Sequence, residues 1–205
     1  MSAFHTVAFA DLTHEESYKI LAATIHPRPI AFVSTQANDG HLNLAPFSFF
    51  MVGGSNPPSL AYSPTLSARG AKDSLRNVLE YREFVVNLVH RDIAERMNLT
   101  SKTVPSDVSE WDLSGLTTEP SLFVAPPRVA ESQIQFECRL FQVVEHGEGP
   151  GAARYVIGEV LAAHIHESLW SDGVIEEQVR LVARLGGNSY LDSESLTIFK
   201  MNRPV

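Results

Sequence analysis

Residues 26–74 of this 205-residue chain read HPRPIAFVSTQANDGHLNLAPFSFFMVGGSNPPSLAYSPTLSARGAKDS. The apolar run over residues 30–35 predicts a β-strand. The ANDG sequence at 37–40 predicts a tight turn, because an Asp-Gly pair tolerates positive φ, and residues 41–45 predict the returning strand. The segment therefore predicts a β-hairpin whose second strand ends beside a polar, proline-containing corner.

The corner begins at Pro46. Proline has no N–H to donate to a sheet, so we expect the chain to leave the sheet at Pro46. This would free backbone N–H groups near Phe47, Ser48 and Phe49. The edge of a flat heterocycle is a suitable acceptor for such groups.

A cationic helix start closes the segment. Apolar residues within 75–79 predict a helix, with Asp73 or Ser74 as its N-cap. Arg69 and Lys72 precede it, and a helix N-terminus flanked by cations favours a phosphate. We expect Asp73 to cap the helix and the phosphate to lie on the Lys72 and Ser74 side. An ordinary capped helix with solvated cations is the open alternative.

The rest of the chain predicts strands with a few outer helices. Residues 15–23 and 92–101 predict helices, the second capped by Asp92, and residues 83–89 predict a buried strand. The proline-rich stretch 102–127 is long for a loop, so we expect a turn of helix there and a functional or interface role.

Two further strands complete the pattern. Residues 134–140 alternate apolar and polar, and Leu140-Phe141 breaks the alternation, which predicts a bulge or bend. A GEGPG turn at 147–151 leads into a strand over 155–165. We expect one domain over residues 1–205, mainly β with peripheral helices, folded as a closed or nearly closed β-barrel.

These segments carry a resemblance in collinear order over about residues 20–190. The chain resembles the flavin reductase-like family of FMN-binding split β-barrel proteins, whose members are labelled flavin reductase, flavoprotein oxygenase or flavoredoxin. The family's common KDT is here Lys72-Asp73-Ser74, which keeps a hydroxyl. The matching segments are RPIAFVST, NLAPFSFF, NPPSLAYS, KDSLRNV, EFVVNLV, AERMNLTS, PPRVAES, ECRL, VIGEV and ARLGG.

The resemblance implies a homodimer that binds FMN, with FAD as the alternative, near the subunit interface. Around the ring and ribityl chain we expect Ser34, Thr35, Asn43, Ala45, Pro46, Phe47 and Ser48. Around the phosphate we expect Ser63, Arg69, Lys72, Asp73 and Ser74, and from the RLGGNSY segment Arg184 and Tyr190, which the partner subunit could contribute.

The predicted function is flavin-dependent oxidoreduction without a catalytic side chain, because a flavin itself carries the redox step. NADH or NADPH would supply electrons, and free flavin, oxygen or a small-molecule acceptor would take them, with a monooxygenase component as one partner. The alternatives are a non-catalytic FMN-binding electron carrier or redox sensor, and a ligand-binding barrel without flavin.

Composition excludes other classes. A formal net charge of −8 argues against a nucleic-acid surface, which needs clustered Lys and Arg. No signal sequence and no apolar run of roughly 20 residues is present, so we expect a cytoplasmic protein that does not enter a membrane and whose Asn98 sequon is not glycosylated. A single cysteine suits a reducing compartment.

Three other residues invite a chemical interpretation. His164 and His166 share a strand face and could ligate a metal, but no third ligand accompanies them, so we prefer a polar face or dimer contact and expect no metal site. Cys138 lies on the apolar face of its strand, which favours an inert buried thiol over a nucleophile.

Overall fold

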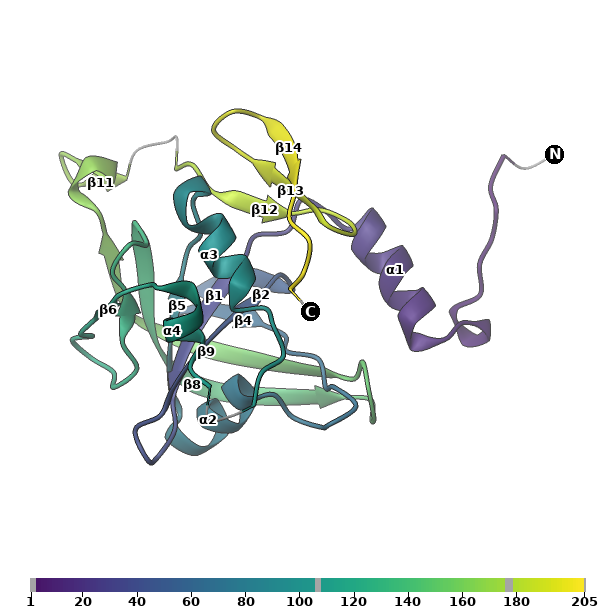
Figure 1. Cartoon of the computed structure of the whole chain (residues 1–205), viewed down its shortest axis with the longest axis horizontal. Coiled ribbons are helices and arrows are strands. Elements are labelled where there is room, and N and C mark those ends of the chain that lie inside the picture. The colour runs from purple at the N-terminus through teal and green to yellow at the C-terminus, as the bar shows by residue number, and fades with distance from the viewer. Residues whose placement is uncertain (1–2, 106–107, 176–178, 205) are drawn as a thin grey trace.

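The computed structural model describes residues 3–105, 108–175 and 179–204. Its centre is an antiparallel seven-stranded sheet in the order β2-β1-β5-β8-β9-β4-β3 (Figure 1). Hairpins join β1 to β2, β3 to β4 and β8 to β9. The other three neighbouring pairs, β1 with β5, β5 with β8 and β4 with β9, join strands that are not consecutive along the chain. The strands are β1 (Ala31–Gln36), β2 (Leu42–Phe47), β3 (Phe50–Ser55), β4 (Pro58–Tyr62), β5 (Glu83–Asn87), β8 (Ile134–His146) and β9 (Ala153–Ile165).

The predicted hairpin is confirmed as β1 and β2, but the prediction that the chain leaves the sheet at Pro46 is wrong. Pro46 lies inside β2, opposite Phe32 of β1. The strand tolerates proline because β2 is at the sheet edge, where one row of N–H groups has no strand partner. The chain turns only after Phe47, between β2 and β3.

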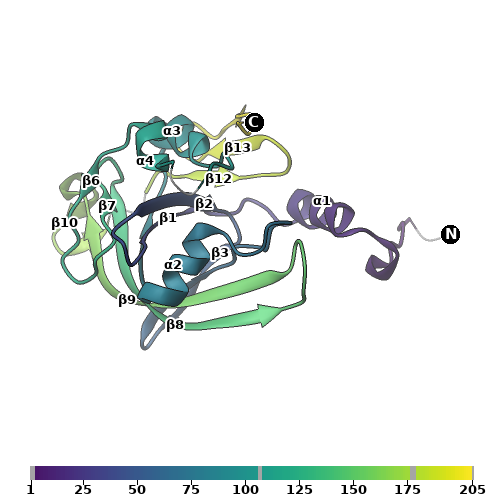
Figure 2. The same cartoon turned by 60° about the horizontal axis from the view of Figure 1, so that its bottom comes forward.

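The predicted bend in the 134–140 strand is also confirmed. β8 and β9 form a long hairpin whose pairing shifts between Leu140 and Gln142, and a second shift lies between Glu137 and Cys138. Bulges of this kind increase the local twist of a strand. Figure 2 shows that the two strands run past α2 (Asp73–Tyr81) and that the predicted turn over residues 147–151 joins them at their far end.

Two hydrophobic clusters lie on opposite sides of β1. Alternating residues of a strand point to opposite faces, so Phe32 joins one cluster while Ala31 and Val33 join the other. The first includes Ile30, Phe32, Leu44, Val89, Ile93, Met97, Trp111 and Tyr190. The second includes Val33, Phe47, Leu60, Tyr62, Leu75, Val78, Phe84 and Cys138.

The helices lie outside the large sheet. The predicted N-terminal helix is α1 (His14–Thr24), which begins with a capping box between Thr13 and Glu16 and extends away from the sheet (Figure 1). The expected turn of helix in the 102–127 stretch is α4 (Glu110–Ser114). Two 3-10 turns, η1 (Phe9–Asp11) and η3 (Glu167–Leu169), accompany them.

The predicted helix over 92–101 has a different start. The chain first forms a 3-10 turn, η2 (Arg91–Ile93), and then α3 (Ala94–Leu99). Asp92 lies within η2 and does not cap α3, because the 3-10 turn that begins at Arg91 makes Ile93 the N-cap of α3. The buried Ile93 and Met97 hold this segment against the first cluster.

Small sheets complete the fold. A three-stranded sheet packs near α3 and consists of β12 (Val182–Arg184), β13 (Ser189–Asp192) and β14 (Thr197–Lys200). Two short pairs of strands remain: β6 (Thr118–Glu119) pairs with β7 (Arg128–Val129), and β10 (Trp170–Ser171) pairs with β11 (Val174–Ile175). Among the described residues, no helix is long and apolar enough to cross a membrane.

Candidate functional site

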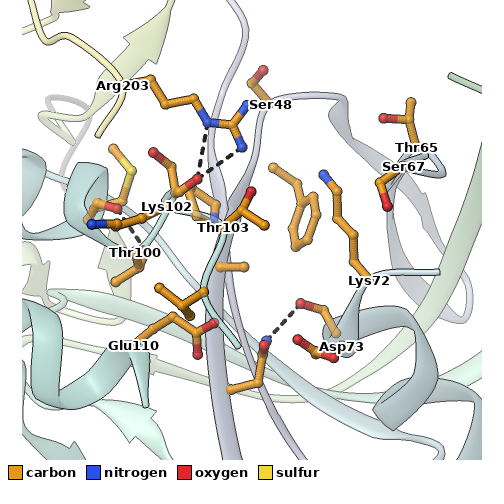
Figure 3. Close-up of a pocket in the computed structure, with 18 of the residues that line it drawn as sticks. Ser48, Thr65, Ser67, Lys72, Asp73, Thr100, Lys102, Thr103, Glu110 and Arg203 are labelled. Carbon is orange, nitrogen blue, oxygen red and sulfur yellow. Dashed lines mark hydrogen bonds between the residues drawn. The ribbon is translucent and has the colours of Figure 1, made fainter. Parts of the chain in front are cut away.

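A cavity of about 460 Å³ lies where the end of β2, the start of α2, the segment after α3 and the C-terminal tail meet (Figure 3). This volume is in the range of small-molecule and cofactor sites. Its wall includes Tyr18, Asn43, Ala45, Pro46, Phe47, Ser48, Ser63, Thr65, Ser67, Arg69, Lys72, Asp73, Ser74, Arg76, Lys102, Thr103, Glu110, Arg184, Tyr190 and Arg203.

One end of the cavity is a cationic corner formed by residues 67–74. Ser67 and Gly70 exchange two backbone hydrogen bonds, and this tight turn requires the positive φ of +91° that glycine adopts readily. The turn places Arg69 and Lys72 beside the first turn of α2. The corner therefore combines two cations with a helix N-terminus.

The expected capping of this helix by Asp73 or Ser74 is wrong. The N-cap is Lys72, and no described side chain caps α2. Asp73 is the first helical residue, and its carboxylate pairs with Arg76 one turn later. Because the first N–H groups of a helix have no partner within the helix, this uncapped end keeps donors for an anion.

Ser63 follows β4 and points a buried hydroxyl at the same region. The residue is 6% exposed, lines the cavity, and its Oγ has no hydrogen-bond partner among the described residues. A buried hydroxyl without a partner costs free energy. A ligand oxygen at this end of the cavity would remove that cost.

Lys72 reaches over the cavity floor. Its Nζ lies 5.4 Å from the centre of the Phe47 ring. Although solvent reaches this side chain, protein surrounds it, and this desolvation, together with the charge of Arg203, lowers the pKa of Lys72. An anion bound here would be attracted by the charge of this ammonium group.

Buried polar groups fix the centre of the wall. Asn43 Nδ2 donates to Ser74 Oγ at 2.8 Å, which ties β2 to α2. The N–H of Leu44 points at the Glu110 carboxylate at 3.4 Å, and burial raises the pKa of Glu110. These contacts hold the hairpin, α2 and α4 in a fixed relation around the cavity.

Arg184 and Tyr190 line the far side. The Arg184 guanidinium lies 4.5 Å from the centre of the Tyr190 ring and donates to its hydroxyl, and Arg184 Nη2 donates to Gly187 at 2.5 Å. Tyr190 in turn donates to Asn98. Both residues come from the same chain as the cationic corner.

The structure brings together every predicted site residue except Ser34 and Thr35. Both lie in β1 and are fully buried away from the cavity. Ser34 Oγ donates to the carbonyl of Pro127, and Thr35 Oγ1 accepts from Asn77 at 3.1 Å. The expectation that these two hydroxyls surround a ring is therefore not met, because they fasten β1 to its neighbours.

Sequence reasoning missed part of the wall. Thr65 and Ser67 line the cavity and lie only a few residues before Arg69. Two hydroxyl residues so close to the start of the helix were a sequence signal that could have identified them. The segment 100–105 and Arg203 are distant in sequence and have no such signal. Their place follows from tertiary packing of α3 and the C-terminal tail.

The two histidines lie outside the cavity and differ in role. His164 Nε2 lies 2.6 Å from Glu137 Oε1, whereas His166 is at the start of η3, where its Nδ1 accepts from the N–H of Ser168. No group of three or more potential metal ligands lies together among the described residues. Cys138 is fully buried in the second cluster, and burial raises its pKa, as expected for an inert thiol.

The comparisons with known proteins identify the family. A flavin reductase-like domain model matches residues 23–197. Nitrilotriacetate monooxygenase component B from Bacillus cereus is 33% identical, with 94% of this chain and 96% of that protein covered and a TM-score of 0.88. The 2-nitrobenzoate 2-nitroreductase of Pseudomonas fluorescens is 28% identical, with 98% and 96% covered and a TM-score of 0.84.

A third structure is a protein with a split barrel domain from Shewanella frigidimarina. It is 23% identical, with 96% of this chain and 95% of that protein covered and a TM-score of 0.77, and this likeness supports the fold alone. The predicted fold class, mainly β with peripheral helices in a split β-barrel, is thereby confirmed. Since the family model spans most of the chain, from before β1 into β14, this protein belongs to the flavin reductase-like family.

Proposed function

We propose that this protein is an oxidoreductase that binds FMN in the cavity and takes reducing equivalents from NADH or NADPH. The phosphate of FMN would lie in the cationic corner. The observation that carries this proposal is a set of donors in the cavity wall that have no acceptor within the described part of the chain. They are the Ser63 hydroxyl, the first N–H groups of α2 and the Lys72 ammonium group.

The residues present fit this cofactor. A phosphate accepts several hydrogen bonds and carries negative charge, which matches the hydroxyl, N–H and ammonium donors of the residues that line this cavity. The cavity wall also includes Ala45, Pro46 and Phe47, which offer an uncharged, apolar surface for a flat ring. The edge of that ring would face Ser48 and the backbone beyond β2.

Bound FMN would supply the redox chemistry, so the protein's task is to bind, orient and shield it. Lys72 and the α2 N-terminus would hold the phosphate. Asn43, fixed by its hydrogen bond to Ser74, would keep the β2 wall in place. The cavity remains open on one side for a second reactant.

The acceptor and partners belong to this proposal as well. One structural relative is named as a monooxygenase component and another as a nitroreductase. For this protein we propose a homodimer in which reduced flavin either leaves for a monooxygenase component or oxygen, or stays and reduces a small molecule.

The test is an absorbance spectrum of the purified protein with and without added FMN, followed by NADH and NADPH oxidation with free FMN present. We expect a flavin spectrum perturbed by the protein and steady turnover with one or both nucleotides. Absence of any flavin binding would contradict the cofactor assignment. Bound flavin without nucleotide turnover would indicate an electron carrier or sensor instead.

A further inference from the structure

The cavity wall holds more positive charge than an FMN phosphate requires. Six cationic side chains line it, Arg69, Lys72, Arg76, Lys102, Arg184 and Arg203, against the two carboxylates of Asp73 and Glu110. Of the six, only Arg76 forms an ion pair with a carboxylate among the described residues. An excess of positive charge therefore remains after the roughly two negative charges of a phosphate monoester are counted.

This excess contrasts with the whole chain, whose formal net charge is −8. The cations also divide between two walls. Arg69 and Lys72 belong to the cationic corner, whereas Lys102 follows α3 and Arg203 belongs to the C-terminal tail. Figure 3 shows Arg203 and Lys72 directed into the cavity from opposite sides, with Ser48 and Thr103 between them.

The tail that carries Arg203 is firmly attached. Met201 is buried in the first hydrophobic cluster, and its N–H donates to Asn188 at 3.0 Å. Asn98 Nδ2 donates to the carbonyl of Asn202 at 2.8 Å. The backbone just before Arg203 is thus fixed against α3 and the loop before β13.

The guanidinium itself is oriented but not neutralised. Arg203 Nε and Nη2 donate to the carbonyl of Ser101 at 3.1 and 2.9 Å. A guanidinium has five N–H donors in a planar fork, so this single acceptor leaves others available. A carbonyl oxygen carries no full charge, so Arg203 keeps its attraction for an anion.

We propose that Arg203, with Lys102 beside it, binds the phosphate groups of the nicotinamide donor, on the wall opposite the FMN phosphate. This assignment rests on the proposed function, because it needs FMN in the cationic corner and a second reactant in the same cavity. A nicotinamide nucleotide suits the arrangement: it has an uncharged ring at one end and negatively charged phosphates beyond it. With its ring over the centre of the cavity, its phosphates could reach the Arg203 wall.

The test is anaerobic stopped-flow bleaching of protein-bound FMN, at saturating FMN, as a function of NADH concentration in wild type and Arg203→Gln. We expect the apparent Kd for NADH to rise about tenfold or more, as for loss of a charge-assisted contact, and the limiting rate to stay within about threefold. Arg203→Lys should restore part of the affinity. Added salt should weaken NADH binding in wild type more than in Arg203→Gln.

Two controls separate recognition of phosphate from damage to the fold. An uncharged donor, 1-benzyl-1,4-dihydronicotinamide, should bleach both proteins with the same concentration dependence. Arg139→Gln, which neutralises an exposed arginine of β8 outside the cavity, should behave as wild type. An unchanged NADH dependence in Arg203→Gln, or an equal loss for NADH and the benzyl donor, would overturn the assignment.

Failure of this inference is distinguishable from failure of the proposed function. If wild type binds no FMN, or NADH does not bleach bound FMN, the proposed function itself fails and Arg203 has no donor to recognise. If both steps occur and only the effect of Arg203→Gln is missing, the oxidoreductase proposal stands and the role of Arg203 is wrong.

Discussion

At the scale of single residues, the account depends on donors that the protein itself leaves unsatisfied. Ser63 keeps a buried hydroxyl without a partner among the described residues, and Lys72 carries its charge where protein surrounds it. Both features are unfavourable by themselves, and a bound anion would offset their cost. We therefore propose that these residues would bind the phosphate.

The first prediction concerns Lys72→Ala. Removing one charge-assisted contact should weaken FMN binding roughly tenfold to a hundredfold and leave riboflavin, which lacks the phosphate, nearly unaffected. Titration of both ligands by fluorescence measures this, with Lys200→Ala, an exposed lysine on β14, as the control. An equal loss for the two ligands would show that Lys72 acts through the fold instead.

The second prediction concerns pH. Desolvation by the surrounding protein, with the charge of Arg203, lowers the pKa of Lys72 from its ordinary value of 10.5, so its ammonium group loses its proton at a lower pH than usual. Because the charged form binds phosphate, FMN affinity should fall as pH rises through this lowered pKa. Riboflavin affinity should not follow, and Lys72→Ala should abolish the dependence. A parallel pH profile for both ligands would contradict this explanation.

At the scale of elements, the fully buried Glu137 of β8 holds the segment that follows β6. Its carboxylate accepts the N–H groups of Leu122 and Phe123 at 2.8 and 2.6 Å and contacts His164. Burial alone raises the pKa of this group, but the hydrogen bonds outweigh it, and the pKa of Glu137 is lowered. The charged carboxylate is thus the form that fastens this loop to the sheet.

The third prediction is that Glu137→Gln lowers the free energy of unfolding by about 2 kcal/mol near pH 7. The N–H groups of Leu122 and Phe123 donate to different oxygens of the carboxylate, and in glutamine one of those oxygens is replaced by an NH2 group, which cannot accept. A lowered pKa in the folded state adds stability above the unfolded value of about 4.3 and loses it as pH falls below that value. Wild type should therefore lose more stability than Glu137→Gln below pH of about 4.3. Equal acid sensitivity in urea-unfolding series would refute the role of this carboxylate.

Individual elements also indicate how far the sequence could predict the fold. Local signals sufficed for the β1–β2 hairpin, α1 and the bulge in β8, because turn residues and apolar periodicity act over a few positions. Pro46 led to a wrong prediction of where β2 ends, because the sequence does not show that β2 lies at the sheet edge, where a proline is tolerated. Arg203 and residues 100–105 reach the cavity through packing between segments far apart in sequence, which no local pattern encodes.

At the scale of the whole molecule, α1 extends away from the large sheet (Figure 1). Tyr18 and Leu21 of α1, and Ile25 directly after it, are substantially exposed. Exposed apolar side chains on one element are typical of an interface. The fourth prediction is a homodimer: sedimentation equilibrium at micromolar concentration should give twice the chain mass of 22.6 kDa. A single-chain mass with flavin still bound would contradict it.

The central claim is that the cavity binds FMN with its phosphate in the cationic corner. The most direct measurement is a crystal structure of the protein grown with FMN. The account predicts the phosphate within hydrogen-bond distance of Ser63 Oγ and at the start of α2, with Lys72 beside it. FMN bound with its phosphate elsewhere, on the Arg203 wall or outside the cavity, would contradict it.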